Sequence, residues 1–456
     1  MNDETPQTPE TPGGGGSAPE PGPSLEKAPS GPWPSVTQDG SPEPEPESSG
    51  GGAGAGSAPA SGGDTPPEPS SRWREVFREI ATGSLLVSVL SVFLAMVVGS
   101  LMILLTDETV RESAGYIGAR PSDFFYAVRD AVVDAYTALF RGSIYNTNVE
   151  GFDRRIRPLT ETLKYSGPLI LAGLGVGLAF RAGLFNIGGR GQMLLAGAAA
   201  GWVAVTVDLP LVLHLPLAVL AGAVAGALWA GLAGFLKART GAHEVIVTIM
   251  LNYVGFYLVF YALSRQGLLQ APGSGNPKSE AMPESAKLPK LLGEDFNLHA
   301  GFVLALVAVA FVWWLLNKSA LGFRFRAVGE NPEAARASGI HVGRTYTTVM
   351  LIAGALVGLA GVNQVLGTAT SGVTVDLDAG IGFDAITVAL LGRSRPVGIL
   401  AAGLLFGALK AGGFSMAAAE GIPVEIVLVI QSLIVLFIAA PPLVRAIFRL
   451  PKGATA

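Results

Sequence analysis

The chain has 456 residues, of which 50% are hydrophobic and only 14% are charged, and its mean hydropathy is +0.46. Soluble domains carry about 25% charged residues, so this composition predicts a polytopic membrane protein. The absence of cysteine excludes disulfides and thiolate metal sites, and four scattered histidines argue against a histidine metal site.

Residues 1–70 differ in composition from the rest of the chain. They hold 16 of the 31 prolines, long Gly/Ser runs, and 11 acidic residues against one lysine. Such a segment cannot bury enough apolar surface to offset the entropy of ordering, so we predict a disordered cytoplasmic tail. It is either a solvated tail or a Pro-rich docking or regulatory arm. The transmembrane domain is expected over residues 71–450.

The remainder predicts an all-α polytopic membrane protein with about ten transmembrane helices. Several apolar runs are shorter than the ~20 residues of a straight crossing, so some segments must be broken or re-entrant. The expected spans are Ser84–Leu105, 164–180, 190–207, 211–235, 243–263, 300–317, 346–368, 383–392, 397–411 and 423–440.

Basic residues beside the short loops predict the orientation of the chain in the membrane. With ten spans they fall on one face, and the positive-inside rule makes that face and both termini cytoplasmic. Residues 106–163, with an amphipathic helix around Pro121–Phe140, and the loop 264–299 are then external. The basic residues are Arg72, Arg74, Arg78, Arg181, Arg190, Lys237, Arg239, Lys318, Arg324, Arg326, Arg336, Arg344, Arg393, Arg395, Arg445, Arg449 and Lys452.

A glycine-rich stretch, Arg181–Gly191, interrupts the apolar pattern around Asn186. Non-helical backbone at membrane depth persists only where protein or a water-filled cavity satisfies it. The stretch is therefore either a tight interhelical turn or a broken segment that lines a substrate pathway.

Glu244, Thr248 and Asn252 recur every four residues and so share one helix stripe. Glu244 reads as a charge at a helix N-terminus, and Asn252, two turns deeper, is the better pathway candidate. Further intramembrane polar residues are Asn363, Gln364 and Asp384. Each either holds helices together or contacts a neutral, hydroxyl-rich solute.

The basic segment 318–345 contains the signature of a short capped cytoplasmic helix. Asn331 is the expected N-cap, Pro332 the first helical residue, Glu333 is favourable in the first turn, and Gly339 ends the helix. A capped helix between two membrane spans can transmit force to or from a soluble partner.

The sequence contains no phosphate-binding loop, metalloprotease helix or serine-hydrolase elbow. An enzyme acting alone is therefore not expected, and neither a catalytic residue, a bound metal nor a nucleic-acid partner is predicted.

Four sequence blocks resemble the permease subunits of bacterial ABC importers. The nearest branch is the ribose/galactose-type family, the branched inner-membrane translocators, and within it the nucleoside-importing members. The similarity runs from about Leu159 to Ala440, and Arg190 stands where the family usually has an acid. The blocks are GLFNIGGRGQMLLAG (183–197), AHEVIVTIMLNY (242–253), FRAVGENPEAARASGI (325–340) and GFDAITVALLGRSRPVGILAAGLLFGAL (382–409).

This resemblance implies a membrane-spanning permease that imports nucleosides or related sugar-containing solutes. It implies a cytosolic ATPase that holds ATP and Mg, a second identical or paralogous permease, and a substrate-binding lipoprotein. Segment 325–340 would contain the coupling helix, with Glu330, Asn331, Pro332, Glu333, Ala334, Arg336 and Gly339 as ATPase-coupling residues. Asn186, Asn252, Asn363, Gln364 and Asp384 are the expected pathway residues.

Two alternatives remain open. Simple sugars such as ribose or galactose are the other substrate class. An ATP-independent secondary transporter or channel is the other mechanism, because broken helices with buried Asp384 or Glu244 would suit cation coupling.

Overall fold

The computed structural model describes residues 84–449. The predicted tail at 1–70, the basic residues Arg72, Arg74 and Arg78, and Lys452 lie outside the described residues. Within residues 84–449 the structure is helical, and its only β-type pairings are two isolated bridges, Gln266 with Gln270 and Lys290 with His299.

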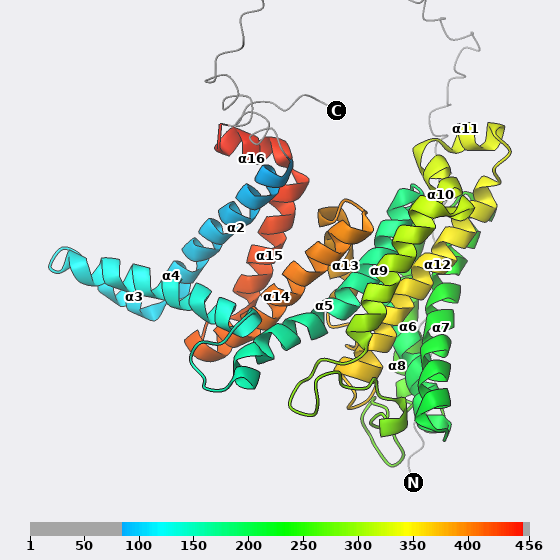
Figure 1. The fold of residues 1–456 in the computed structure, drawn as a ribbon, viewed down its shortest axis with the longest axis horizontal. Helices are drawn as coiled ribbons and strands as arrows, with labels where there is room; N and C mark the ends of the chain where they lie inside the picture. The colour runs from blue at the N-terminus through cyan, green and yellow to red at the C-terminus, as the bar shows by residue number, and fades with distance from the viewer. Residues whose placement is uncertain (1–83, 450–456) are drawn as a thin grey trace, which may run out of the picture. The chain divides into compact units, whose positions relative to one another are not determined.

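The helices follow one another closely along the chain (Figure 1). The first group is α2 (Ser84–Thr106), α3 (Glu108–Ala114), α4 (Pro121–Ser143), α5 (Phe152–Arg181), α6 (Gly189–Thr206), α7 (Leu211–Thr240) and α8 (Glu244–Leu263). After the 3-10 turn η1 (Glu284–Ala286) come α9 (Gly301–Lys318), α10 (Ala320–Glu330), α11 (Pro332–Ala337) and α12 (Val342–Asn363). The last group is the π-helical turn η2 (Gln364–Thr368), α13 (Ile381–Leu391), α14 (Pro396–Glu420), α15 (Val424–Ala439) and α16 (Pro441–Ile447).

Each of the ten predicted spans contains a helix, and seven helices of the described part are long and apolar enough to cross a bilayer alone. The bent pair α15 and α16, which turns by 94°, is an eighth candidate. α6 begins with the polar turn Gly189–Gln192, and α13 has 11 residues, or about 16 Å of helix, which is too short to cross. The predicted class, an all-α polytopic membrane protein with broken segments, is confirmed.

Helices α5 and α12 form the centre of the bundle. Every residue from Ser166 to Ala179 of α5 is buried, and 13 of the 22 residues of α12 are buried. Gly226 of α7 and Gly354 of α12 let these helices touch, because a Cβ on Gly226 would lie 2.5 Å from the Gly354 carbonyl oxygen. Small residues serve this purpose in membrane bundles, where close packing replaces the hydrophobic effect.

A second helical group is built around α2, α4 and α15. Ile103 of α2, Ala135 of α4 and Ile430 of α15 belong to one buried apolar cluster. Helix α14 connects this group to the centre, because it packs against both α4 and α5. The predicted amphipathic helix around Pro121–Phe140 is α4, which confirms its helical form.

Helix α9 separates two polar regions of the chain. The loop 264–299 precedes it, and in that loop η1 is the one described helical turn. Helices α10 and α11 follow it at the opposite end (Figure 1). The 18 residues of α9 are about 27 Å long, so the two regions lie on opposite sides of a membrane-sized layer.

Candidate functional site

The interruption predicted at 181–191 is a break between two helices. α5 ends at Arg181 and α6 begins at Gly189. Gly183 has φ +72°, a left-handed value that favours glycine, and Leu184 and Asn186 are fully buried. The buried backbone N–H groups of this break need partners from the protein.

Two polar residues of α8 supply these partners. Thr248 Oγ1 accepts a hydrogen bond of 3.2 Å from the Ile187 amide. Asn252 Oδ1 accepts one of 2.8 Å from the Gly191 amide, and its Nδ2 donates to the Ile187 carbonyl at 2.9 Å. The predicted stripe therefore exists, and it holds the broken segment through both amide atoms of Asn252.

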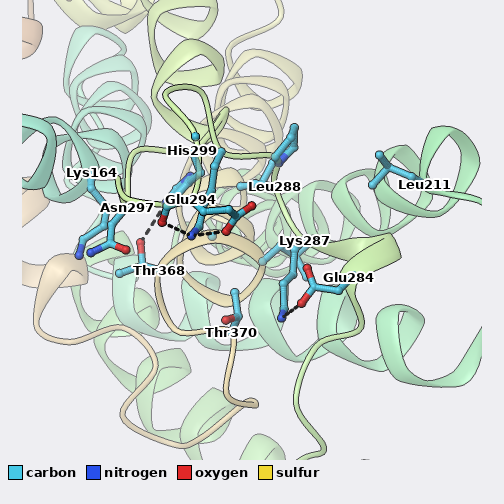
Figure 2. A pocket seen from close by; sticks show the side chains of 15 residues that line it. Lys164, Leu211, Glu284, Lys287, Leu288, Glu294, Asn297, His299, Thr368 and Thr370 are labelled. Carbon is cyan, nitrogen blue, oxygen red and sulfur yellow. Dashed lines mark hydrogen bonds and ion pairs between the residues drawn. The ribbon is translucent and has the colours of Figure 1, made fainter. Parts of the chain in front are cut away.

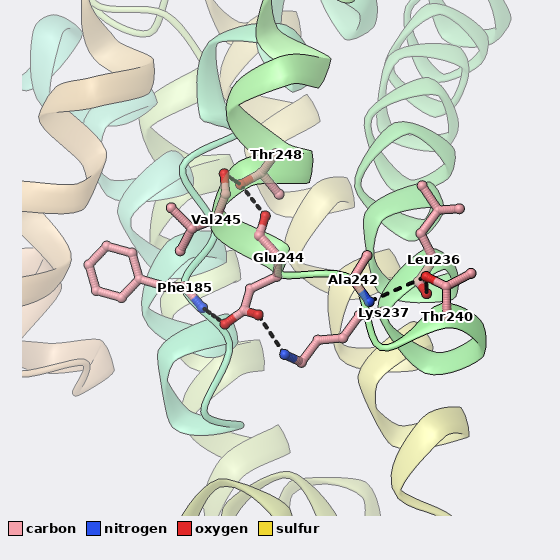
Figure 3. Close-up of polar contacts among 8 residues, drawn as sticks. All are labelled: Phe185, Leu236, Lys237, Thr240, Ala242, Glu244, Val245 and Thr248. Carbon is pink, nitrogen blue, oxygen red and sulfur yellow. Dashed lines mark hydrogen bonds and ion pairs between the residues drawn. The ribbon is translucent and has the colours of Figure 1, made fainter. Parts of the chain in front are cut away.

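Glu244 completes this stripe at the first turn of α8 (Figure 3). Its Oε1 accepts from the Phe185 amide at 3.4 Å, and its Oε2 pairs with Lys237 Nζ of α7 at 2.5 Å. Its place at the helix N-terminus was predicted, but its lysine partner was not. The carboxylate thus links α7, α8 and the break.

Asn186 lies within the break and is 0% exposed. Its Oδ1 accepts from the Gly188 amide and from Gln192 Nε2, both at 3.0 Å, and its Nδ2 lies 3.3 Å from Gln192 Oε1. The side chain therefore caps the irregular backbone where α6 starts. Asn186 and Asn252 act on the same short segment from two sides.

Helix α10, which lies in the segment predicted to be cytoplasmic, contacts this break directly. Gly329 of α10 lies against Gly183, whose added Cβ would be 3.4 Å from the Gly329 Cα. Three residues later, at Pro332, α11 begins. Helix α10 therefore connects α11 to the broken segment.

Helix α11 has the geometry expected from its sequence. Asn331 Oδ1 accepts from the Glu333 and Ala334 amides, both at 3.0 Å, and Arg336 pairs with Glu333 at 2.7 Å. Gly339 follows the helix with φ +81°. The predicted cap, start and stop are confirmed, with one refinement, because Glu330 is the last residue of α10.

One face of this helical turn is free. Glu330, Asn331, Glu333, Ala334 and Arg336 are all exposed, whereas Ala335 is 4% exposed and packs beneath them. A short capped helix with a polar exposed face can insert into a groove on another protein.

Asn363 and Gln364 lie where α12 changes into the π-helical turn η2. Asn363 is 0% exposed and sits between Gly167 of α5 and Gly301 of α9, and neither of its amide atoms has a hydrogen-bond partner within residues 84–449. Gln364 Oε1 is likewise unpaired there. Unpaired buried amides are costly, and π-turns concentrate at functional sites, so this junction is a candidate functional site.

A cavity of about 660 Å³ opens beside this turn (Figure 2). Its volume lies in the usual range for small-molecule sites. It is lined by Lys164, Leu211, Glu284, Lys287, Leu288, Pro289, Lys290, Gly293, Glu294, Asn297, His299, Leu366, Gly367, Thr368 and Thr370.

The charges around this cavity are balanced. Lys287 pairs with Glu284 at 2.5 Å and Lys290 with Glu294 at 2.8 Å, while Lys164 pairs with the neighbouring Glu161. The lining therefore offers many hydrogen bonds and little net charge, which suits a neutral polar solute.

His299 is neutral at physiological pH. Burial, and secondarily the nearby Lys164 charge, lower the pKa of His299 to about 4. Its Nδ1 accepts from the Gly301 amide at 3.2 Å, and its Nε2 lies 3.4 Å from Thr368 Oγ1. The ring thus ties the start of α9 to the π-turn.

Asp384 belongs to a charged group that the sequence only partly revealed. Gln431 Nε2 of α15 donates to Asp384 Oδ1 at 3.3 Å. Nearby, Asp378 pairs with Arg190 at 3.4 Å, and Lys410 donates to the Ala379 carbonyl at 3.0 Å. Lys410 was missed, although an ionisable residue within the apolar run 397–411 is itself a signal of function.

The five predicted pathway residues therefore fall into distinct groups. Asn186 and Asn252 share the break, and Asp384 adjoins it through the contact between Gly382 and Gly189, where an added Cβ on Gly189 would lie 2.6 Å from the Gly382 carbonyl oxygen. Asn363 and Gln364 make none of these contacts in the described structure.

Comparison with known proteins places the chain in a family. The family model described as the permease component of a branched-chain amino acid transport system matches residues 159–439. The guanosine ABC transporter permease protein NupP of Bacillus subtilis is 40% identical over 316 residues, which cover 69% of this chain and 88% of the relative.

Two further relatives are similarly close. The glucose ABC transporter permease protein TsgB13 of Haloferax volcanii is 41% identical over 67% of this chain and 80% of its own length. The nucleoside ABC transporter permease protein NupB of Lactococcus lactis is 37% identical over 65% and 82%. No solved structure matches significantly.

These similarities confirm the resemblance carried by the four sequence blocks. The matched region begins within α5 and includes the break, α11, the π-turn and the charged group. The chain belongs to the family of branched-chain amino acid transport system permease components, and it is a multi-pass membrane transport subunit rather than an enzyme.

Proposed function

We propose that this chain is the membrane-spanning subunit of an ATP-driven importer of nucleosides in a bacterial plasma membrane. The observation that carries the proposal is α11, a capped exposed helix joined to a broken membrane segment, in a chain similar to guanosine and nucleoside permeases. The neutral lining of the 660 Å³ cavity supports an uncharged, hydroxyl-rich solute.

ATP and Mg would bind to a separate cytosolic ATPase, which holds α11 in a groove. Its contact residues would be Glu330, Asn331, Pro332, Glu333, Ala334, Arg336 and Gly339. Closure of the ATPase would displace α11, and the Gly329–Gly183 contact would carry the movement to residues 182–188. Both chain termini would then lie in the cytoplasm.

A second permease subunit would complete the pathway. The chain is 40% and 29% identical to NupP and NupQ of Bacillus subtilis, and 37% and 30% identical to NupB and NupC of Lactococcus lactis. Because it is more similar to one member of each pair, we favour a paralogous partner over an identical one. A substrate-binding lipoprotein would dock on the external regions 106–163 and 264–299.

Within the pathway, the predicted residues would have different roles. Asn363, whose two amide atoms are unpaired, and Gln364, whose Oε1 is unpaired, would contact the solute at the outer end. Asn186 and Asn252 would hold the movable break, since their amide atoms already bind the protein. Asp384 would lie beside the route as part of the charged group.

The alternative mechanism is a secondary transporter. The observation that favours it is the charged group around Asp384. Arg190, Asp378, Asp384 and Lys410 lie around the junction of α6 and α13, where a coupling cation could act. Such a carrier would work without an ATPase, so the two mechanisms are separable.

The test is uptake of radiolabelled guanosine in cells that carry the complete transport system. Glu333→Arg, which reverses the charge on the exposed face of α11, should abolish uptake while the membrane level and subunit assembly stay normal. Lys318→Glu, a charge reversal outside α11, is the matched control and should retain uptake. Unchanged uptake in Glu333→Arg cells that lack the ATPase would overturn the importer.

Substrate choice is tested in the same cells. Guanosine uptake that unlabelled nucleosides suppress and glucose or ribose does not supports the proposal. Uptake of glucose or ribose without guanosine would replace the substrate and leave the mechanism in place.

A further inference from the structure

Four helices line a cavity that the transport function does not use. It has a volume of about 390 Å³ and lies where α9 ends, α10 returns and α14 begins. Three arginines line it, Arg181 at the end of α5, Arg326 of α10 and Arg395 at the N-cap of α14.

The positive charge in this cavity has no compensation from the described protein. No acidic residue lines the cavity, and none of the three arginines forms an ion pair with a carboxylate within residues 84–449. Arg181 Nε donates to the Ser394 carbonyl at 3.1 Å, which fixes its position without neutralising it. Three like charges around one space repel one another, so the arrangement favours an anion.

The backbone adds to this preference. The 25-residue helix α14 begins at Pro396 without a side-chain cap, so the positive end of its dipole faces the arginines. The preceding turn holds Arg393 and Ser394 at φ +52° and +51°, which is unusual for residues other than glycine. This strained turn presents the Ser394 carbonyl to Arg181 and leads directly into Arg395.

The other side of the cavity is apolar and outward-facing. Trp313 of α9 is 47% exposed and Val397 of α14 is 64% exposed. Tryptophan beside arginines at a helix end is typical of the membrane–water interface. One end of a ligand bound here would contact three guanidinium groups. Its other end would contact outward-facing hydrophobic side chains.

We propose that this cavity binds the phosphate headgroup of an anionic membrane lipid, with the acyl chain lying along Trp313 and Val397. Guanidinium groups bind phosphate in a bidentate manner, and basic pockets between helix ends are a known form of lipid recognition. The bound lipid would join α5, α10 and α14 beside the Gly329–Gly183 contact. This site is separate from the solute pathway and does not depend on which solute is carried.

Lipid retention by the purified complete transporter tests the proposal. Native mass spectrometry should show phosphatidylglycerol retained in preference to phosphatidylcholine. Arg326→Gln should reduce that retention about fivefold, and the triple variant R181Q/R326Q/R395Q should reduce it further. The Arg326 side chain makes no hydrogen bond or ion pair within residues 84–449, so the single variant removes its charge without breaking a polar contact.

Controls separate this site from its rivals. Arg239→Gln, at the end of α7 and outside the cavity, should retain the lipid, and the triple Arg→Lys variant should retain part of it. Equal retention of both lipids, or equal loss in Arg239→Gln, would overturn the proposal. Full displacement of the lipid by soluble glycerol phosphate would also overturn it, because the cavity would then be a site for free phosphate. Loss of the ATPase from the triple variant with unchanged lipid retention would overturn it as well, because the arginines would then contact the ATPase.

Discussion

Gly329 of α10 lies so close to the end of α5 that a Cβ there would be 2.2 Å from the Arg181 carbonyl oxygen. Only glycine allows this approach, because the obstacle is backbone and cannot rotate away. The contact joins the helix that precedes α11 to the break between α5 and α6.

Substituting this glycine tests the contact. In an ordinary helix Gly→Ala stabilises by about 0.5–1 kcal/mol, but Gly329→Ala should destabilise by about 1–3 kcal/mol because it forces the two backbones apart. The free energy of unfolding in nanodiscs measures the effect. Gly118→Ala, where an added Cβ meets nothing within 4 Å, is the control. A stabilised Gly329→Ala protein would contradict the packing.

Removing the Asn252 side chain should loosen the broken segment. Asn252→Ala leaves the Gly191 amide and the Ile187 carbonyl buried without this partner, at a cost of about 1–3 kcal/mol for each group. We expect faster hydrogen exchange at Gly191 and a lower unfolding temperature. Tyr253→Leu, at a neighbouring position that is 61% exposed, should change neither. Unaltered exchange in Asn252→Ala would show that the hydrogen bond is dispensable.

The cap of α11 should control the order of that helix. Asn331→Ala removes the acceptor for two amides and should destabilise the helix by about 1 kcal/mol, whereas Asn331→Asp keeps the acceptor. Hydrogen exchange at Glu333 and Ala334 measures the difference. If the proposed coupling is right, uptake falls in the alanine variant and persists in the aspartate variant. Equal exchange in both variants would exclude a capping role.

Stability should depend on pH through His299. Its pKa is about 4 in the folded protein and 6.5 in the unfolded chain, so the unfolded state binds more protons between these values. Stability is therefore retained above pH 6.5 and lost as the pH falls towards 4, by about 2 kcal/mol at pH 5. Chemical unfolding at pH 7.5 and pH 5 should show this loss, and His299→Asn should reduce it. An identical pH dependence in both proteins would assign the effect to another group.

The local features of the fold were predictable because they depend on neighbouring residues. Apolar run lengths gave the positions of all ten helical segments, and Asn331-Pro332 with Gly339 gave both ends of α11. The stripe on α8 followed from a four-residue spacing. Each of these signals lies within a few turns of one helix.

The contacts between distant residues were not predictable from these patterns. Arg190 meets Asp378 and Lys237 meets Glu244 because of how helices pack, which depends on the shapes of many small residues. The cavity beside η2 is lined by residues from α5, the loop before α9 and the turn after α12, so no pattern within one segment predicts it. A pattern marks which residues are polar, but packing decides which of them meet.

The π-helical turn Gln364–Thr368 gives α12 a spare residue at its C-terminal end. A π-turn contains one residue more than an α-turn, and each residue of an α-helix corresponds to about 100° of rotation. Transfer of that residue along the helix would rotate the C-terminal end by about this angle while the hydrogen bonds of the N-terminal part stay intact. Gln364 and Thr368 are four residues apart and share roughly one face, so both would turn together toward other neighbours, and α12 could rotate locally without a break in the helix.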